Sequence, residues 1–263
     1  MSQQFKRKEE TLGKEMTVDE VIAYTLKDLQ FKKVFTTFSL PDSLKEYLKA
    51  YEIEAEYASN AKEAALLADV YARDTNGPSV LLLIPGSQVL ETIGIIAQAF
   101  MDSLPLFIIS SLRSFKDTGR ARIGELKNPV DIINTLKPIV KSYEQITDIE
   151  NSYIILLKAY KDLLSNRPRP VYIEIAEDLF RLKAYPLTPS EQKPERRTPD
   201  KNTTAKVAEV LSNAKMPVIV AGYGVIISNG WDDLRQLAEY LDIPVISTIR
   251  AKGVIPSNHP LYA

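Results

Sequence analysis

Short apolar runs alternate along the chain with longer segments in which apolar residues recur every three or four positions. The short runs have the length of strands that are buried on both faces, and the longer segments have the period of helices that pack on a sheet. Strands that alternate with helices in this way form a parallel sheet with helices on both sides. The pattern therefore predicts an α/β protein with a doubly wound, mainly parallel sheet.

The same pattern gives approximate bounds for each element. The predicted strands are 33–37, 52–58, 80–84, 106–110, 171–175, 218–221 and 245–249. The predicted helices are 17–27, 43–51, 59–73, 88–101, 152–164, 204–213 and 232–241. Thr17 with Glu20, and Asn60 with Glu63, have the spacing of capping boxes at helix starts. In the second box we expect the Glu63 carboxylate near the backbone N–H of Asn60.

Composition shifts divide the chain into four parts. Residues 1–16 form a charged leader, and residues 17–183 hold most of the predicted α/β elements. Residues 184–200 are rich in proline and charge and have no apolar period, which indicates a linker. Residues 201–263 hold about two strands and two helices, too little for a sheet with protected edges. We therefore expect this partial α/β domain either to pack on the first domain or to be one part of a larger domain.

Composition excludes several kinds of chemistry. The chain has 263 residues, a formal net charge of -1 and no cysteine, which excludes disulfides and thiolate sites and argues against nucleic acid or anionic membranes as partners. No apolar run is long enough to span a bilayer, and the charged N-terminus lacks the apolar region of a secretory signal, so we expect a cytoplasmic protein. The single histidine, His259, lies in a turn-like stretch and is predicted to be a loop residue rather than an acid–base catalyst.

An ordered set of short motifs connects these elements. It consists of Tyr71-Ala72-Arg73, Asn76-Gly77-Pro78, Pro85-Gly86, Met101-Asp102-Ser103-Leu104-Pro105, Lys137-Pro138, Arg167-Pro168-Arg169-Pro170, Gly222-Tyr223-Gly224 and Pro244-Val245. In this order the set resembles the thiamine-diphosphate enzymes of the acetolactate synthase, pyruvate oxidase and benzoylformate decarboxylase group. The resemblance covers essentially residues 17–263. The resemblance implies that this chain has a pyrimidine-binding-type first domain followed by part of a central domain.

The resemblance has consequences for the cofactor. In that family the first domain binds the aminopyrimidine of thiamine diphosphate, and a C-terminal domain holds the diphosphate through a metal ion. This sequence has no Gly-Asp-Gly metal motif, so no metal site is predicted in it. Thiamine diphosphate with Mg²⁺ is therefore expected only together with a partner chain. Flavin adenine dinucleotide, which some relatives hold in the central domain, is not expected.

The family's activating glutamate has no counterpart here. In the family it lies twelve residues before the arginine of the Tyr-Ala-Arg triplet, a position that Ala61 occupies in this sequence. That carboxylate bonds a pyrimidine nitrogen and so favours deprotonation of the thiazolium carbon, which a methyl group cannot do. Glu63 is a weak substitute, because two helical residues place it about 200° around the axis from Ala61. No catalytic residue is assigned, and Glu63 is predicted to be a helix cap.

Other chemistry-bearing positions also differ from the family pattern. The glycine-rich turn after the first strand is replaced by residues 36–40, which have no glycine, and the Gln-Glu pair corresponds to Asn128-Pro129. The resemblance leaves a small set of positions for cofactor contact: Pro85, Gly86, Ser87, Gln88 and Phe38. Packing motifs are thus retained while the residues for chemistry are replaced.

Two further constellations have ordinary structural explanations. Gly222 and Gly224 follow a predicted strand and could bind a nucleotide, although a third glycine of the dinucleotide fingerprint is missing. Four basic residues lie close together: Arg113, Lys116, Arg120 and Arg122. They are predicted to form a solvated loop, and the alternative is an anion-binding site.

Three hypotheses about function remain open. The chain is a non-catalytic member that acts as a subunit or a regulatory or structural partner, or the pyrimidine-side subunit of a split 2-oxo acid decarboxylase or carboligase, or a nucleotide-binding protein. The first two require a partner, either a second copy or a chain with a diphosphate-binding domain. Apolar residues in the loops at the strand ends are expected to form that partner surface: Phe38, Leu40, Pro41, Ile84 and Pro85.

Overall fold

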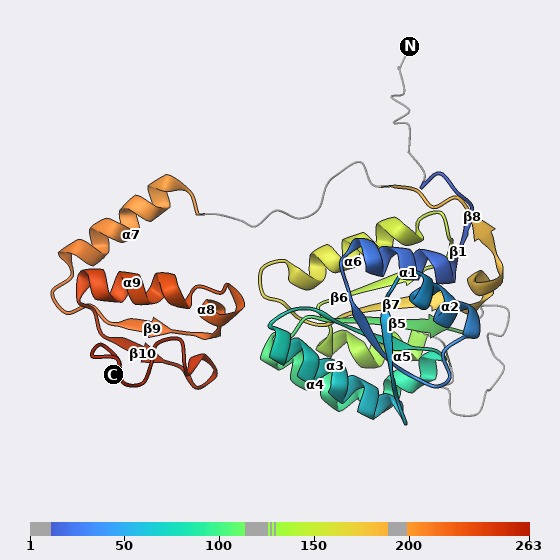
Figure 1. The fold of residues 1–263 in the computed structure, drawn as a ribbon, viewed down its shortest axis with the longest axis horizontal. Coiled ribbons are helices and arrows are strands. Elements are labelled where there is room, and N and C mark those ends of the chain that lie inside the picture. Colours follow the sequence, from blue (N-terminus) through green and yellow to red (C-terminus); the bar gives the residue numbers. More distant parts are fainter. Residues whose placement is uncertain (1–11, 114–125, 127, 129, 189–198) are drawn as a thin grey trace, which may run out of the picture. The chain divides into compact units, whose positions relative to one another are not determined.

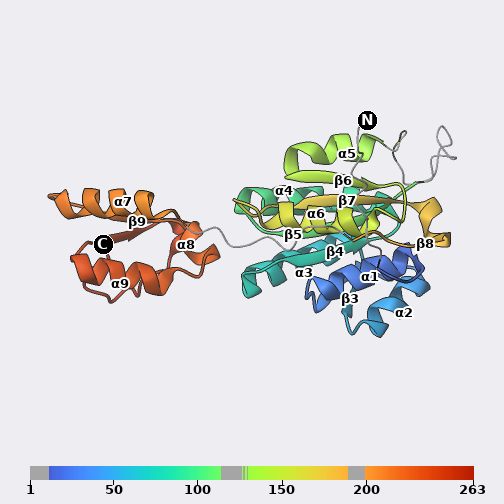
Figure 2. The ribbon, with the colours of Figure 1, turned by 90° about the horizontal axis from the view of Figure 1, so that it is seen from above.

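The computed structural model describes residues 12–113, 126, 128, 130–188 and 199–263. The chain divides into two compact units, Met1–Pro194 and Glu195–Ala263, which are described separately below. Figures 1 and 2 show the elements of each unit from two directions.

The first unit is built on a six-stranded sheet with the order β3-β2-β4-β5-β7-β6, in which all neighbouring strands are parallel. Its strands are β2 (Lys33–Thr37), β3 (Glu54–Ala58), β4 (Ser79–Leu83), β5 (Leu106–Leu112), β6 (Ser142–Ile146) and β7 (Val171–Ala176). The predicted fold class is confirmed, and five of the six strands lie where the apolar pattern placed them. The edge strand β6 was not predicted, because its sequence, SYEQI, is mainly polar.

Helices cover both faces of this sheet. They are α1 (Val18–Asp28), α2 (Asp42–Ala50), α3 (Ala61–Thr75), α4 (Ile93–Asp102), α5 (Val130–Leu136) and α6 (Ser152–Leu164). One buried cluster joins α1, α2 and α6 to sheet residues such as Val34, Phe107 and Ile173. A second cluster, on the other face, joins α3, α4 and α5 to residues such as Leu81 and Ile108. Burial on both faces explains why the central strands are continuous apolar runs.

Helix starts agree with the predicted caps, with one correction. The Asn60 side chain accepts a bond from the backbone N–H of Glu63 at 2.9 Å, and Thr17 does the same for Glu20 at 3.3 Å. The Glu63 carboxylate, however, accepts from the backbone N–H of Ser59 at 3.0 Å, and from its hydroxyl, rather than from Asn60. The prediction of Asn60 as its partner was wrong by one residue, because the extended backbone of the N-cap brings the preceding N–H within reach.

The predicted helix 88–101 begins differently from the expectation. Its first part, η1 (Gly86–Thr92), is a 3₁₀ helix, and α-helical geometry begins only with α4. A further 3₁₀ turn, η3 (Lys137–Ile139), follows α5, and η4 (Glu177–Arg181) follows β7. The short strands β1 (Met16–Thr17) and β8 (Lys183–Ala184) form an antiparallel pair, so residues at the borders of the predicted leader and linker belong to the first unit.

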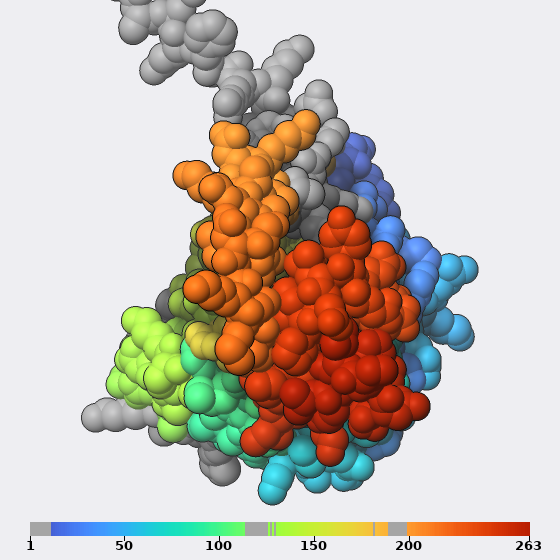
Figure 3. All heavy atoms as spheres, turned by 90° about the vertical axis from the view of Figure 1, so that its left-hand side faces the viewer, coloured from blue at the N-terminus to red at the C-terminus, as the bar shows by residue number. Residues whose placement is uncertain are grey.

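The second unit contains a two-stranded parallel sheet. Its elements are α7 (Lys201–Asn213), β9 (Ile219–Ala221), α8 (Tyr223–Ile227), α9 (Trp231–Leu241), β10 (Val245–Ser247) and η5 (Ile249–Ala251). A small core on one side of the sheet includes Ala221, Ala238 and Val245. No residue of α7 is buried, and Figure 3 shows this helix in orange as a ridge beside the red remainder of the unit.

None of the helices in the described ranges is both long enough and apolar enough to cross a lipid bilayer.

Candidate functional site

The carboxyl ends of β2 and β4 bring the predicted cofactor-contact residues to one edge of the sheet. Phe38 directly follows β2, and residues 85–88 lie one residue beyond the end of β4, its hydrogen-bonded neighbour. Open α/β sheets bind ligands at this edge, so the candidate residues share one edge of the sheet, and their contact with a cofactor stays a prediction.

Polar side chains at this edge bond mainly to one another. The Thr37 hydroxyl donates to the Gln88 amide oxygen at 3.0 Å, and the Gln88 amide nitrogen donates to Ser39 Oγ at 2.8 Å. The Ser39 hydroxyl lies 2.7 Å from Thr37 Oγ1 and donates to the carbonyl oxygen of Ile84 at 2.6 Å. This network ties the loop after β2 to η1, so Gln88 holds the two loops together.

Gly86 is required by packing against the neighbouring strand. A Cβ atom at this position would lie 1.7 Å from the carbonyl oxygen of Ser111 and 2.8 Å from Ser110 Oγ. The Gly86 N–H also donates to Ser111 Oγ at 3.0 Å. The family glycine is therefore retained for a close approach of two strand ends, which any side chain would prevent.

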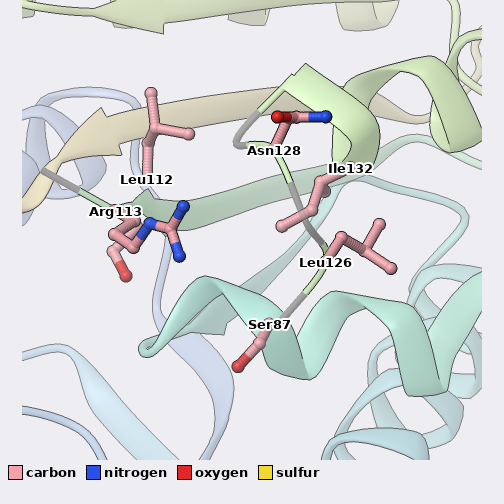
Figure 4. A pocket seen from close by; sticks show the side chains of 7 residues that line it. Ser87, Leu112, Arg113, Leu126, Asn128 and Ile132 are labelled. Atoms are coloured by element: carbon pink, nitrogen blue, oxygen red, sulfur yellow. The ribbon is translucent and has the colours of Figure 1, made fainter. Parts of the chain in front are cut away.

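The cavity beside Gly86 is small. It has a volume of about 20 Å³, which is enough for roughly one water molecule. Ser111 lines it together with the six residues labelled in Figure 4: Ser87, Leu112, Arg113, Leu126, Asn128 and Ile132. Arg113, which directly follows β5, is 5 % exposed, so it is a buried residue and the prediction of a solvated loop was wrong for it. The other members of the predicted basic stretch, Lys116, Arg120 and Arg122, lie outside the described residues.

Ala61 is the first residue of α3 and is only 2 % exposed. It belongs to a buried apolar cluster together with Phe35, Leu83 and Val89. Glu63 is exposed, and the bonds from Ser59 lower the pKa of its carboxyl group. The helix therefore directs a methyl group into the core at the position where the resemblance would place the glutamate, while the nearby carboxylate caps the helix in solvent.

The apolar loop residues do not form the continuous exposed face that we expected. Leu40 and Ile84 are buried, and Pro41 is half-buried, because these residues complete the core beneath the strand ends. Phe38 is 69 % exposed and stacks on Tyr57 with ring centroids 5.5 Å apart, and Pro85 is exposed. The expectation of a five-residue partner surface at this edge was wrong for Leu40 and Ile84.

The motifs on which the resemblance rests make contacts that pack neighbouring elements together. Arg73 Nε donates to Asp69 at 2.7 Å, and Arg73 Nη2 donates to Asp102 at 2.7 Å. The arginine of the Tyr-Ala-Arg triplet thus joins α3 to the end of α4. The guanidinium of Arg167, in the Arg-Pro segment, donates to Ser103 Oγ at 2.5 Å and to the Met101 carbonyl at 3.1 Å.

A buried carboxylate on β7 was not predicted. The Glu174 carboxylate accepts from the Tyr143 hydroxyl at 2.9 Å and from the Tyr172 hydroxyl at 3.0 Å, and Tyr172 also bonds Ser110. Burial raises the pKa of Glu174, while the two phenol bonds oppose that shift. Its position inside an apolar run gave no signal, although Tyr172 lies two residues away on the same strand and only Tyr143 comes from the neighbouring strand β6.

The candidate residues of the second unit are Gly222, Gly224 and His259. An added Cβ at Gly222 or Gly224 would meet no atom within 4 Å, so neither glycine is needed for a close approach. His259 Nδ1 accepts from the backbone N–H of Leu261 at 3.2 Å, and Nε2 lies 3.0 Å from the Glu239 carboxylate. His259 thus anchors the C-terminal segment to α9.

Comparisons with known proteins agree with the motif order. Residues 16–135 match the family model for the N-terminal TPP binding domain of thiamine pyrophosphate enzymes, and residues 204–263 match the model for the central domain of the same enzymes. The chain contains N-terminal and central domain sequence of thiamine pyrophosphate enzymes. The predicted family resemblance is therefore confirmed.

The individual relatives are distant from this chain in sequence. It is 32% identical over 253 residues to the acetolactate synthase large subunit of Buchnera aphidicola subsp. Schlechtendalia chinensis, covering 92% of this chain and 43% of the relative. It is 31% identical over 205 residues to a protein named a probable 2-ketoarginine decarboxylase of Pseudomonas aeruginosa, covering 76% of this chain and 36% of that protein. The chain thus spans less than half the length of these relatives.

A solved structure supports the fold. A Mycobacterium smegmatis protein described as a candidate thiamin diphosphate-dependent enzyme superposes with a TM-score of 0.77 at 23% identity, over 95% of this chain and 48% of that chain. At this identity the match establishes the fold alone.

The first unit does not fit the activating half of a thiamine diphosphate site. Ala61 provides no carboxylate, and the amide of Gln88 is bonded to Thr37 and Ser39. No catalytic step through the cofactor is therefore assigned to these residues.

Proposed function

We propose that this chain is a divergent, non-activating member of the acetolactate synthase-like proteins, which acts as a subunit or as a regulatory or structural partner. The observation that carries the proposal is the buried methyl group of Ala61 at the start of α3. Activation of the cofactor needs an ionisable oxygen at that point, and the nearest carboxylate along the helix is bonded to Ser59. The packing motifs around Arg73 and Gly86, in contrast, hold the fold intact.

A split enzyme is the second candidate. The chain matches the N-terminal and central domain models and covers under half of its relatives, so a second chain with a diphosphate-binding domain would complete the arrangement of the family. In such a complex, thiamine diphosphate and Mg²⁺ would depend on the partner, and the substrate would be a 2-oxo acid. Both versions of the proposal assume that the protein is cytoplasmic. Nucleotide binding at Gly222 and Gly224 has less support, because the open space around both glycines shows no built site.

The experiment is an assay of carbon dioxide release. The purified full chain is incubated with pyruvate or 2-ketoarginine, thiamine diphosphate and Mg²⁺. We expect no release above the level without protein. Cofactor-dependent release from the chain alone would overturn the proposal, and release only after addition of a diphosphate-domain chain would favour the split enzyme.

A further inference from the structure

Glu174 lies in the first unit on the face of the sheet that α5 covers, as Figure 2 shows for β6 and β7. Its side chain is fully buried, and Tyr172, two residues earlier on the same face of β7, shares a cluster with Leu136 of α5. The Glu174 carboxylate accepts one bond from Tyr172 and one from Tyr143, whose rings stack with centroids 6.1 Å apart. Among the described residues its donors are thus neutral phenols, which leaves a buried negative charge costly.

Hydrogen-bonded groups continue from Tyr172 toward the end of β5. Tyr172 Oη lies 3.1 Å from Ser110 Oγ, and Ser110 Oγ lies 3.3 Å from the carbonyl oxygen of Ser111. That carbonyl oxygen is the atom against which Gly86 packs, and the Gly86 N–H donates to the Ser111 hydroxyl. A continuous chain of polar groups therefore joins the buried carboxylate to the contact between β5 and the start of η1.

The direction of this chain depends on the charge of Glu174, because each hydroxyl group has one proton to donate. When the carboxylate is ionised, it accepts from Tyr172, and Tyr172 accepts from Ser110. When the carboxyl group is protonated, it donates to Tyr172, Tyr172 donates to Ser110, and the Ser110 hydroxyl donates to the next carbonyl oxygen. The two states therefore differ at the Ser111 carbonyl oxygen beside Gly86.

The proton of neutral Glu174 is expected on the side of Tyr172. In the described part of the chain, Tyr143 bonds no acceptor besides Glu174, so its reversal would leave the phenol proton without a protein acceptor. Tyr172 has Ser110 as a second partner. Burial raises the pKa of both phenols, so both keep their protons where Glu174 titrates.

The charged groups of the surrounding elements have other partners. Asp131 accepts from a backbone N–H just before α5, and Glu144 of β6 pairs with Lys158 of α6 at 2.7 Å. Glu177, which follows β7, lies at the far end of the chain, with its Oε1 3.5 Å from Ser111 Oγ. A test of the chain therefore has to separate the titration of Glu177 from that of the buried carboxylate.

We propose that Glu174 is a proton-sensitive switch that acts through Tyr172 and Ser110 on the end of β5. Its charge sets the direction of the hydrogen bonds, and so the contact with Gly86 at the start of η1. The same η1 carries Gln88 and its bonds to the loop after β2. Proton binding in the core is thereby coupled to the two loops at the carboxyl edge of the sheet. The inference goes beyond the proposed function, because it requires neither a cofactor nor activity.

The test is NMR of the full chain with ¹⁵N-labelled glycine and ¹³C-labelled glutamate carboxyl groups, from about pH 4 to 9. The chain has 10 glycines, so the amide spectrum is simple to assign. We expect the Gly86 amide signal to shift with the same midpoint as the Glu174 carboxyl signal, at a pKa above the ordinary 4.5. Glu174→Gln identifies the carboxyl signal and should abolish the Gly86 shift at this midpoint.

Two variants cut the chain, and a third leaves it intact. Tyr172→Phe and Ser110→Ala each remove one link, so Glu174 should still titrate while the pH-dependent shift of Gly86 is lost. Tyr143→Phe is the matched control, because it removes a phenol from the same carboxylate outside the chain. It should raise the pKa of Glu174 and keep the Gly86 shift at the new midpoint.

The second control, Glu177→Gln, should leave the Gly86 shift unchanged. Loss of the shift in this variant would assign it to Glu177 and overturn the proposal. The same holds for a Glu174 carboxyl signal that does not titrate in this range, or for a Gly86 signal that does not follow it. A shift that survives in Tyr172→Phe or Ser110→Ala would show that the charge acts through space, which also overturns the proposal; a dispersed amide spectrum verifies that each variant is folded.

Discussion

The two ends of helix α3 differ in which residues of the family pattern they retain. At its C-terminal end, Arg73 bonds Asp69 and Asp102 and so joins α3 to α4. At its N-terminal end, Ala61 is buried among apolar side chains, and the cap is formed by Asn60 and Glu63. One helix therefore retains a packing motif of the thiamine pyrophosphate enzymes while lacking the carboxylate that the family resemblance would place at its start. Fold and chemistry can be lost separately, because they depend on different residues of the same element.

The largest predicted effect concerns packing at the strand ends. Gly86→Ala should lower the free energy of unfolding by about 3 kcal/mol or more, because the new methyl group would collide with the backbone of Ser111. Gly94→Ala is the matched control, since a Cβ there meets no atom within 4 Å and alanine favours the helix. Urea unfolding of both variants gives the comparison. Equal stability of the two variants would show that Gly86 is not a packing residue.

The second prediction concerns the retained end of α3. Arg73→Ala should destabilise the first unit by about 2 kcal/mol, because it leaves the largely buried carboxylate of Asp69 without its guanidinium partner. Lys45→Ala breaks the exposed pair with Asp42 and should produce no resolvable change. Thermal unfolding followed by circular dichroism measures both. A loss for Lys45→Ala as large as that for Arg73→Ala would remove the distinction between a packing motif and a surface ion pair.

Local and long-range features differ in how far the sequence predicted them. The caps at Thr17 and Asn60 were predictable because their partners lie three residues away. Strand β6 and the bond from Tyr143 to Glu174 were not, since they depend on pairing between β6 and β7, whose residues lie about thirty positions apart. The need for glycine at position 86 likewise comes from Ser111.

The site shows the same limit. The motif order brought residues 85–88 and Phe38 to one edge of the sheet, because the ends of neighbouring parallel strands meet there. It could not show that Gln88 bonds Ser39, or that Leu40 and Ile84 turn inward. Those outcomes depend on side-chain packing between two loops.

A smaller effect is expected from the pH dependence of Glu174. Burial raises the pKa of this group in the folded chain, so the folded state binds its proton more tightly than the unfolded state does. Its contribution to stability is therefore complete below the ordinary pKa of 4.5 and is lost as pH rises through the raised value. Glu174→Gln should remove this loss, so the stability of the original chain relative to the variant should fall as the pH rises from 4.5 through the raised pKa of Glu174.

The control for this prediction has the opposite sign. Lys27 lowers the pKa of Glu52, so that group contributes stability above its ordinary pKa and loses the contribution as the solution becomes acidic. Glu52→Gln should therefore weaken the chain slightly near neutral pH. Urea unfolding at a series of pH values checks both variants, and a pH profile unchanged by Glu174→Gln would contradict the role assigned to its burial.

The most direct test of the central claim is proton exchange at the thiazolium carbon of thiamine diphosphate, followed by NMR in heavy water with Mg²⁺ and the full chain. Ala61 provides no carboxylate to favour deprotonation of that carbon, so the account predicts the exchange rate of the free cofactor. Glu63→Gln should give the same rate, because its side chain serves as a cap to Ser59. An exchange rate accelerated by the chain and lost in Glu63→Gln would show that this carboxylate activates the cofactor, and would contradict the account.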